Sequence, residues 1–83
     1  MGRLSKKTKE ADVRIGRAIR TERLARRRSG EWLAEQIGVS TQQIQKYETG
    51  QNRVAVSTLC LIADALGMQR GYLFFAVTHD TKR

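Results

Sequence analysis

Residues 40–53, STQQIQKYETGQNR, place three glutamines within four positions and end in a glycine followed by amide and basic side chains. A glutamine amide donates one hydrogen bond and accepts another, which matches the N6 and N7 groups of adenine in the major groove of DNA. Glutamine is also an ordinary surface residue of soluble helices. The composition therefore leaves two interpretations, a surface that reads DNA bases and a surface that is merely solvated.

A helix over residues 40–49 would sort these side chains into two faces. Ser40 is a favourable N-cap, and Gln43 three residues later completes the pattern of a capping box. At about 100° per residue, one face holds residues that can pack inward. These are Ile44, Tyr47 and Glu48. The opposite face is rich in amide and amine groups, with Gln42, Gln45, Lys46 and Thr49 at its centre and Thr41 and Gln43 at its flanks.

The elements around this run are read from caps and glycines, because the chain contains no proline. Residues 1–8 are polar and basic without an apolar period, which predicts a flexible arm. Residues 9–77 are predicted to form one all-α domain, and residues 78–83 a polar tail. The expected helices of this domain cover residues 9–27, 29–37, 40–49 and 56–66, with a short fifth helix in 71–77.

The second and third expected helices are joined by the turn IGVS at residues 37–40. A short turn with a glycine between two short helices is the signature of a helix-turn-helix. Ala34 is small where the helices would cross, and Gly38 suits the left-handed conformation of the turn. Because the first turn of a recognition helix reaches base edges, we predict base contacts from this helix. The predicted residues are Gln42 and Gln43, with Thr41, Gln45 and Lys46 adding base or phosphate contacts.

The excess positive charge lies in the first third of the chain. Residues 1–28 hold eleven Lys or Arg and three Asp or Glu, a balance of +8, whereas residues 29–83 hold five of each. This asymmetry predicts a polyanionic partner, either nucleic acid or an anionic membrane surface. The first helix has few apolar residues and no large aromatic, so the membrane is the weaker alternative.

The sequence offers few candidate residues for catalysis, metal binding or membrane insertion. Cys60 lies in the apolar run TLCLIADAL, which indicates a buried hydrophobe, and His79 has no partner for a metal or a catalytic pair. No apolar run approaches the roughly 18 residues of a membrane span. We therefore expect no enzyme activity, no metal, no cofactor and no small-molecule ligand, and we expect a cytoplasmic, nucleoid-associated protein.

The stretch SGEWLAEQIGVSTQQIQKYETGQNR, followed by LCLIADALG, resembles the Cro/lambda-repressor-type helix-turn-helix family, often called XRE, over roughly residues 12–75. The most specific pieces are LAEQIGVS, KYETG and IADALG. The resemblance implies a five-helix, lambda-repressor-like fold that binds a palindromic operator, usually as a homodimer, with helix 40–49 in the major groove. The expected function is a transcriptional regulator, most simply a repressor. The alternative is an antitoxin that binds a toxin protein and represses its own operon.

Phosphate contacts are expected beside the predicted recognition helix, because they position such a protein on DNA. The resemblance also implies Asn52 and Arg53 in the following loop. The start of the second helix offers backbone N–H groups at Gly30, where the family usually carries glutamine. Arg28 or Arg27 is expected to take the place of that side chain. The predicted phosphate set is Arg28, Gly30, Gln51, Asn52 and Arg53.

Two further expectations concern packing. Arg23 and Glu48 fall on inward or boundary faces, where an unpaired charge is costly, and the resemblance suggests an ion pair between them. The run YLFF at residues 72–75 is too bulky to face one small core entirely, so part of it is expected to form the homodimer interface. Trp32 lies beside the core stripe, either as a lid over the core edge or as part of a contact surface.

Overall fold

The computed structural model describes residues 2–73, with side chains from Thr8 onward. Its helices are α1 (Gly2–Ala25), α2 (Gly30–Ile37), α3 (Thr41–Glu48) and α4 (Val56–Ala65), and residues 70–73 form a last helical turn. No strand occurs within residues 2–73. The predicted all-α fold is therefore confirmed, whereas the rest of the predicted fifth helix and the tail at 78–83 lie outside the described residues.

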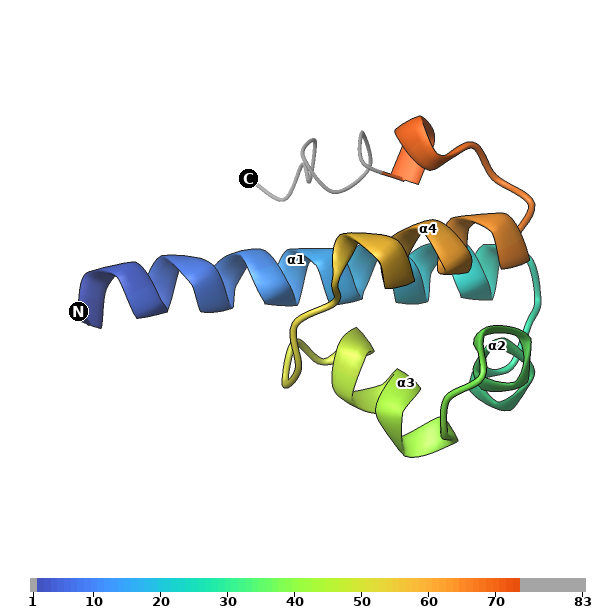
Figure 1. The fold of residues 1–83 in the computed structure, drawn as a ribbon, viewed down its shortest axis with the longest axis horizontal. Coiled ribbons are helices and arrows are strands. Elements are labelled where there is room, and N and C mark those ends of the chain that lie inside the picture. Colours follow the sequence, from blue (N-terminus) through green and yellow to red (C-terminus); the bar gives the residue numbers. More distant parts are fainter. Residues whose placement is uncertain (1, 74–83) are drawn as a thin grey trace.

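Helix α1 differs from its predicted bounds at both ends. It begins at Gly2, so residues 2–8 are helical where the composition predicted a flexible arm, and it ends at Ala25 rather than at Arg27. Leucine, lysine and arginine are good helix formers, and extending an existing helix is easier than starting one. Arg27 has a positive φ of 56° and turns the chain toward α2. Figure 1 shows the start of α1 projecting beyond the other helices.

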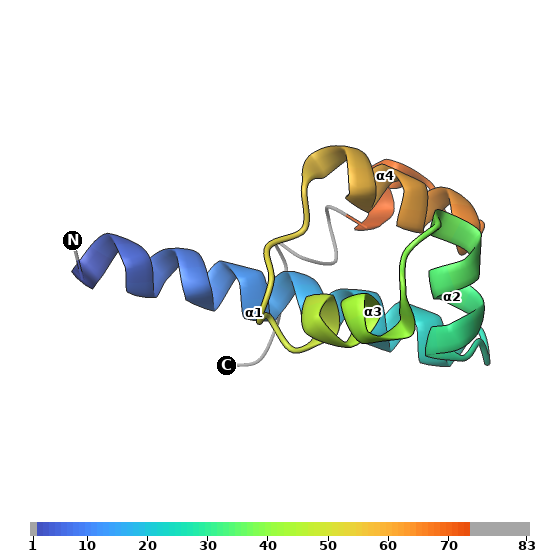
Figure 2. The same ribbon diagram turned by 60° about the horizontal axis from the view of Figure 1, so that its bottom comes forward.

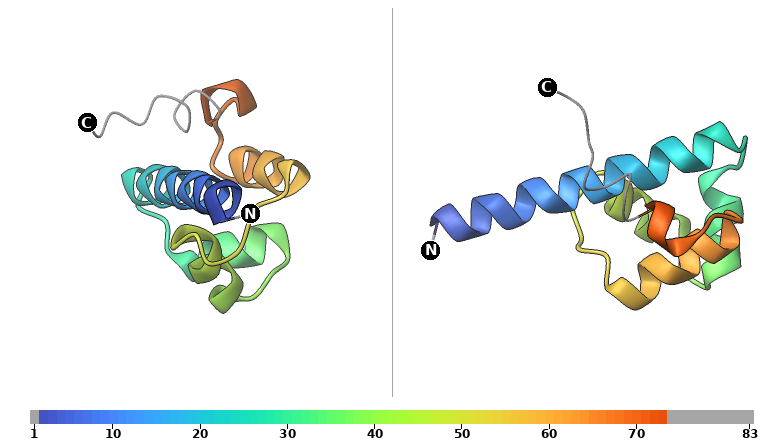
Figure 3. Two further views of the ribbon diagram at one scale, coloured as in Figure 1. Left: turned by 90° about the vertical axis from the view of Figure 1, so that its left-hand side faces the viewer. Right: turned by 90° about the horizontal axis from the view of Figure 1, so that it is seen from above.

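The core is assembled from every helical segment. α2 and α3 lie on one side of α1 and α4, and residues 70–73 lie on the other side (Figures 1 and 3). Each segment contributes one large side chain that is less than 2% exposed, and these are Ile19, Leu33, Ile44, Ile62 and Leu73. Complete burial of such a side chain stabilises the fold by about 1.5–3 kcal/mol. The helices are therefore held together by one shared core rather than by pairwise contacts alone.

The turn between α2 and α3 is built by local hydrogen bonds. The hydroxyl of Ser29 accepts from the Trp32 backbone N–H at 3.0 Å, and that of Ser40 accepts from Gln43 N–H at 3.0 Å. Gly38 ends α2 in the left-handed conformation, with φ 76°. These contacts confirm Ser29 and Ser40 as N-caps and Gly38 as the end of α2. The predicted capping box is only half formed, because the Gln43 side chain donates to Asn52 instead of returning to Ser40. They set α2 and α3 at a steep angle to each other (Figure 2).

Helix α1 crosses the end of α3 at two glycines that allow close backbone approach. A Cβ atom at Gly16 would overlap the carbonyl oxygen of Tyr47 and lie 2.8 Å from the carbonyl carbon of Glu48. Gly50, with φ 79°, ends the α3 segment, and a Cβ there would lie 2.7 Å from Val13 Cγ2. Gly50 directly follows the predicted helix 40–49, whereas the sequence interpretation did not single out Gly16. A glycine inside a helix costs about 1 kcal/mol relative to alanine. Its presence within the predicted first helix was therefore the one sequence feature that could have indicated a close backbone contact at position 16.

Candidate nucleic-acid interface

The outward side of α3 carries the side chains that the helical period placed there. Ile44 is 1% exposed and anchors the helix in the core. Four residues form what we call the outer face of α3, and all four are exposed: Gln42, Gln45, Lys46 and Thr49. Thr41 and Gln43 are half-buried at its flanks. The outer face therefore offers amide, hydroxyl and ammonium groups, and it contains no carboxylate.

The loop after α3 folds back on the helix and pairs two amide side chains. The backbone N–H of Asn52 donates to the carbonyl of Lys46 at 3.1 Å. Gln43 Nε2 then donates to Asn52 Oδ1 at 3.2 Å. A predicted base contact and a predicted phosphate contact thus lie side by side, although Asn52 is distant from Gln43 in sequence. The pair restricts the orientation of both amides before any ligand binds.

Arg53 is tied to α1 by a long ion pair. Its Nε lies 3.4 Å from both carboxylate oxygens of Asp12, while its side chain remains 67% exposed. The Asp12 side chain is 11% exposed, but a pair of this length with one exposed partner contributes little to stability. The ion pair therefore holds Arg53 near the end of α3. The guanidinium can still release Asp12 and bind another anion in its place.

Arg28 and Trp32 form a stacked pair at the start of α2. The Arg28 guanidinium lies over the indole ring, 4.4 Å from the ring centroid, which is a cation–π geometry. Trp32 is half-buried and packs against the core, which supports the interpretation of a lid over the core edge. Gly30 is half-buried beside α3, and a Cβ atom added there would lie 3.8 Å from Ile44 Cγ2. The stack orients Arg28 next to the first turn of α2.

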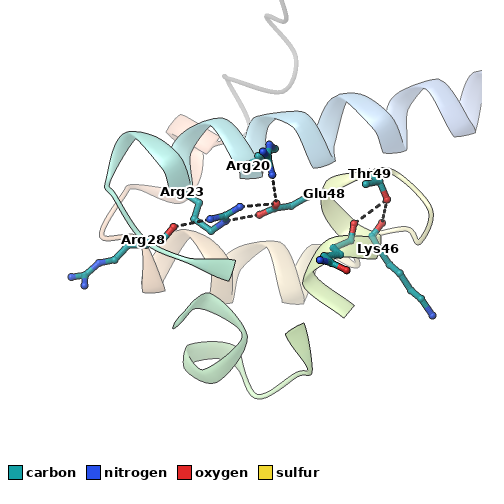
Figure 4. Close-up of polar contacts among 7 residues, drawn as sticks. Arg20, Arg23, Arg28, Lys46, Glu48 and Thr49 are labelled. Carbon is teal, nitrogen blue, oxygen red and sulfur yellow. Dashed lines mark hydrogen bonds and ion pairs between the residues drawn. The ribbon is translucent and has the colours of Figure 1, made fainter. Parts of the chain in front are cut away.

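Arg23 and Glu48 form a bidentate ion pair between α1 and α3 (Figure 4). Arg23 Nε donates to Glu48 Oε2 at 2.7 Å, and Nη2 donates to Oε1 at 3.0 Å. Nη1 donates to the Arg28 carbonyl at 2.7 Å, which attaches the loop before α2. The two side chains are only 8% and 5% exposed. Hydrogen bonding to Glu48 raises the pKa of the Arg23 guanidinium.

A hollow between α1 and α3 adjoins the outer face of α3. Its volume is about 450 Å³, and its lining comes from both helices and the loop after α3. The lining residues are Arg20, Gln42, Gln45, Lys46, Glu48, Thr49 and Gln51. Sequence reasoning did not assign Arg20 to the interface. Its position beside α3 depends on how the two helices cross, and the composition of α1 carries no signal for that.

Residues 2–73 contain no group of three or more His, Cys, Asp or Glu side chains placed to hold a metal ion. Within the same residues, no helix is both long and apolar enough to cross a membrane. Cys60 is half-buried on α4, which is more exposed than the sequence interpretation expected.

Residues 14–71 match the family described as "Helix-turn-helix domain". The chain is 45% identical over 82 residues to an HTH-type transcriptional regulator of Rickettsia conorii, covering 99% of this chain and 66% of that protein. It is 42% identical over 76 residues to an HTH-type transcriptional regulator of Sinorhizobium fredii, covering 92% of this chain and 53% of that protein. The chain thus spans about half to two thirds of the length of these relatives.

Two solved structures have a similar fold. One is the clp gene regulator ClgR from C. glutamicum, with a TM-score of 0.81 and 22% identity over 86% of this chain and 92% of that one. The other is the restriction-modification controller protein C.AhdI from Aeromonas hydrophila, with a TM-score of 0.75 and 29% identity, covering 80% of this chain and 96% of that one. The first likeness concerns the fold alone. The two relatives and C.AhdI are named as regulators or controllers, which agrees with the expectation that this chain is not an enzyme.

Proposed function

The chain belongs to the family of helix-turn-helix domains, and we propose that it binds double-stranded DNA sequence-specifically as a transcriptional repressor. The observation that carries this proposal is the outer face of α3, which is exposed, amide-rich and free of carboxylates. A major groove is wide enough to admit one α-helix, and each base pair presents a distinct set of donors and acceptors there. The rigid crossing of α2 and α3 presents that face as a fixed surface.

Base reading is assigned to the first turns of α3. Gln42 is exposed on the outer face and can form a bidentate pair with an adenine edge. Gln43 keeps its carbonyl oxygen for a base while its amide nitrogen contacts Asn52. Thr41, Gln45 and Lys46 extend the reading surface to neighbouring bases or phosphates.

Phosphate binding is assigned to residues at the two edges of α3. Asn52 and Arg53 follow the helix, with Gln51 beside them in the hollow. Arg28 and the backbone at Gly30 stand at the start of α2, where unpaired N–H groups and the helix dipole favour an anion. Contacts at both edges would fix the angle at which α3 enters the groove. Binding to chromosomal DNA would also place the protein with the nucleoid.

A homodimer on a palindromic operator is the proposed assembly. Apolar side chains are exposed on α4 and on the last helical turn: Val56 is 67%, Leu61 51% and Tyr72 49% exposed. Within YLFF, Leu73 is buried in the core, so Tyr72 is the described residue available to a partner. Residues 74 and 75 of this aromatic segment lie outside the described part of the chain. The antitoxin alternative gains no support from residues 2–73.

Selection of binding sites from random duplex DNA tests the proposal directly. We expect one enriched palindrome whose half-sites lie about one helical turn apart, because two α3 helices of a symmetric dimer would enter successive major grooves. Retention of all sequences alike would overturn the sequence-specific assignment. Repression is tested separately, by placing the selected site over a reporter promoter and expressing the protein. Increased reporter output would contradict the repressor assignment.

A further inference from the structure

Arg20 is a cation of α1 that contacts Glu48 at the end of α3 (Figure 4). Its Nη1 lies 3.6 Å from Glu48 Oε1, and the side chain is 58% exposed. This distance is longer than a hydrogen bond, so the contact is a loose ion pair. The Arg20 end of the pair is exposed and the contact is long, so exchanging Glu48 for another anion costs little.

Glu48 is already neutralised without Arg20. Both of its oxygens accept short hydrogen bonds from Arg23, at 2.7 and 3.0 Å. The Glu48 side chain is 5% exposed, so most of its surface faces Arg23 and the protein. The charge of Arg20 is therefore surplus to the buried pair and remains available at the surface.

The hollow beside Arg20 has the chemistry of a phosphate site. Arg20 and Lys46 place two cations on its walls, and Gln45 and Gln51 add amide donors. Its carboxylate is Glu48, whose charge is balanced by Arg23. An arginine guanidinium matches phosphate geometry through parallel N–H donors. Gln42 and Gln45 of the outer face line the same hollow as Arg20, so a duplex that receives α3 would lie beside Arg20.

We propose that the hollow between α1 and α3 seats one backbone phosphate of the DNA strand that borders the α3-filled groove, with Arg20 as its principal donor. The guanidinium exchanges its loose contact with Glu48 for the phosphate, while Arg23 continues to hold Glu48. This inference rests on the proposed DNA-binding function and deepens it. It extends the interface to the middle of α1, in addition to the start of α2 and the loop after α3.

The test compares Arg20→Gln with the charge-matched control Arg70→Gln. Arg70 is exposed and belongs to the last helical turn. This turn, residues 70–73, lies on the opposite side of α1 and α4 from α3 (Figures 1 and 3). Affinity for the selected duplex and for an unrelated duplex is measured by fluorescence anisotropy at several salt concentrations, and the melting temperature is measured for each variant.

We expect Arg20→Gln to weaken both duplexes by about tenfold, as for loss of a hydrogen bond to a charged group. The slope of log affinity against log salt should become shallower by about 0.9, because one phosphate contact is lost. Arg70→Gln should retain the wild-type slope, and Arg20→Lys should recover part of the lost affinity. The melting temperature of Arg20→Gln should remain close to that of the wild type.

Two outcomes would overturn the phosphate seat. Equal behaviour of Arg20→Gln and Arg70→Gln would show that Arg20 makes no local contact with DNA. Weaker binding of Arg20→Gln with an unchanged salt slope and a lowered melting temperature would show that Arg20 acts by supporting Glu48. Failure of the proposed function is a different result, because the wild type would then prefer no sequence in the site selection.

Discussion

Gly16 of α1 and Tyr47 of α3 approach so closely that the carbonyl oxygen of Tyr47 occupies the space of a side chain at position 16. Backbone lies against backbone at this point, so no rotamer change can relieve an added atom. The contact brings Arg20 and Arg23, four and seven residues later on α1, alongside the end of α3. The geometry of the proposed interface therefore depends on glycine, which has no side chain, at position 16.

We predict that Gly16→Ala lowers the free energy of unfolding by about 2–3 kcal/mol, because the methyl group must push α1 away from α3. The intrinsic gain in helix propensity, about 1 kcal/mol, offsets only part of this cost. Urea denaturation measures the change. Gly71→Ala is the matched control, since nothing lies within 4 Å of its added Cβ. Equal stability of the two variants would contradict the close contact.

The Arg23–Glu48 pair gives a second stability prediction. Arg23→Ala should lower the free energy of unfolding by about 3 kcal/mol, because it leaves Glu48 buried without its donor. Arg20→Ala should change it by less than about 1 kcal/mol, because the bidentate pair remains. In a double-mutant cycle, the combined loss of Arg23 and Glu48 should be smaller than the sum of the single losses. Additive losses would show that the two side chains do not act as a pair.

Gln42 is predicted to determine base preference. Gln42→Ala should cost about 1–3 kcal/mol of binding at one base position and relax the preference there, because the bidentate contact to one base is lost. Affinity for the operator and for its single-base variants measures the effect. A loss of equal size on every variant would move Gln42 from base reading to phosphate contact.

Arg53 is predicted to act on all sequences alike. Arg53→Ala should weaken every duplex by a similar factor and reduce the salt slope by about 0.9, as for one phosphate contact. Asp12→Asn is an informative companion, since it removes the anion that competes for Arg53. That variant should bind DNA at least as tightly as the wild type. Weaker binding by Asp12→Asn would indicate that the ion pair positions Arg53.

Asp64 and Arg70 predict a small pH dependence of stability. Arg70 donates two hydrogen bonds to Asp64, at 3.2 and 2.8 Å, and these lower the pKa of the Asp64 carboxyl below its ordinary 3.8. The stabilisation is therefore present above pH 3.8 and is lost as the pH falls through the lowered pKa. The melting-temperature difference between the wild type and Asp64→Asn should shrink over that acidic range. A difference that stays constant would contradict the pairing.

Most local features were predictable because neighbouring residues determine them. Ser29 and Ser40 cap their helices, Gly38 and Gly50 adopt the left-handed conformation, and the helical period separates Ile44 from the outer face. The extent of α1 was less predictable. A polar basic segment has no apolar stripe, and the helix propensity of residues 2–8 was the only signal that it continues the helix.

The sequence by itself determined an all-α chain, a helix-turn-helix and an amide-rich face of α3, since caps, glycines and helical period act over a few residues. Only the tertiary structure decided which distant side chains meet across that framework. Gln43 contacts Asn52, Arg53 contacts Asp12, and Arg20 faces the hollow beside α3. The contacts of Arg53 and Arg20 depend on the crossing of α1 and α3, which close backbone packing at Gly16 sets. A crossing angle is a property of two packed surfaces, so the residues of one helix do not encode it alone.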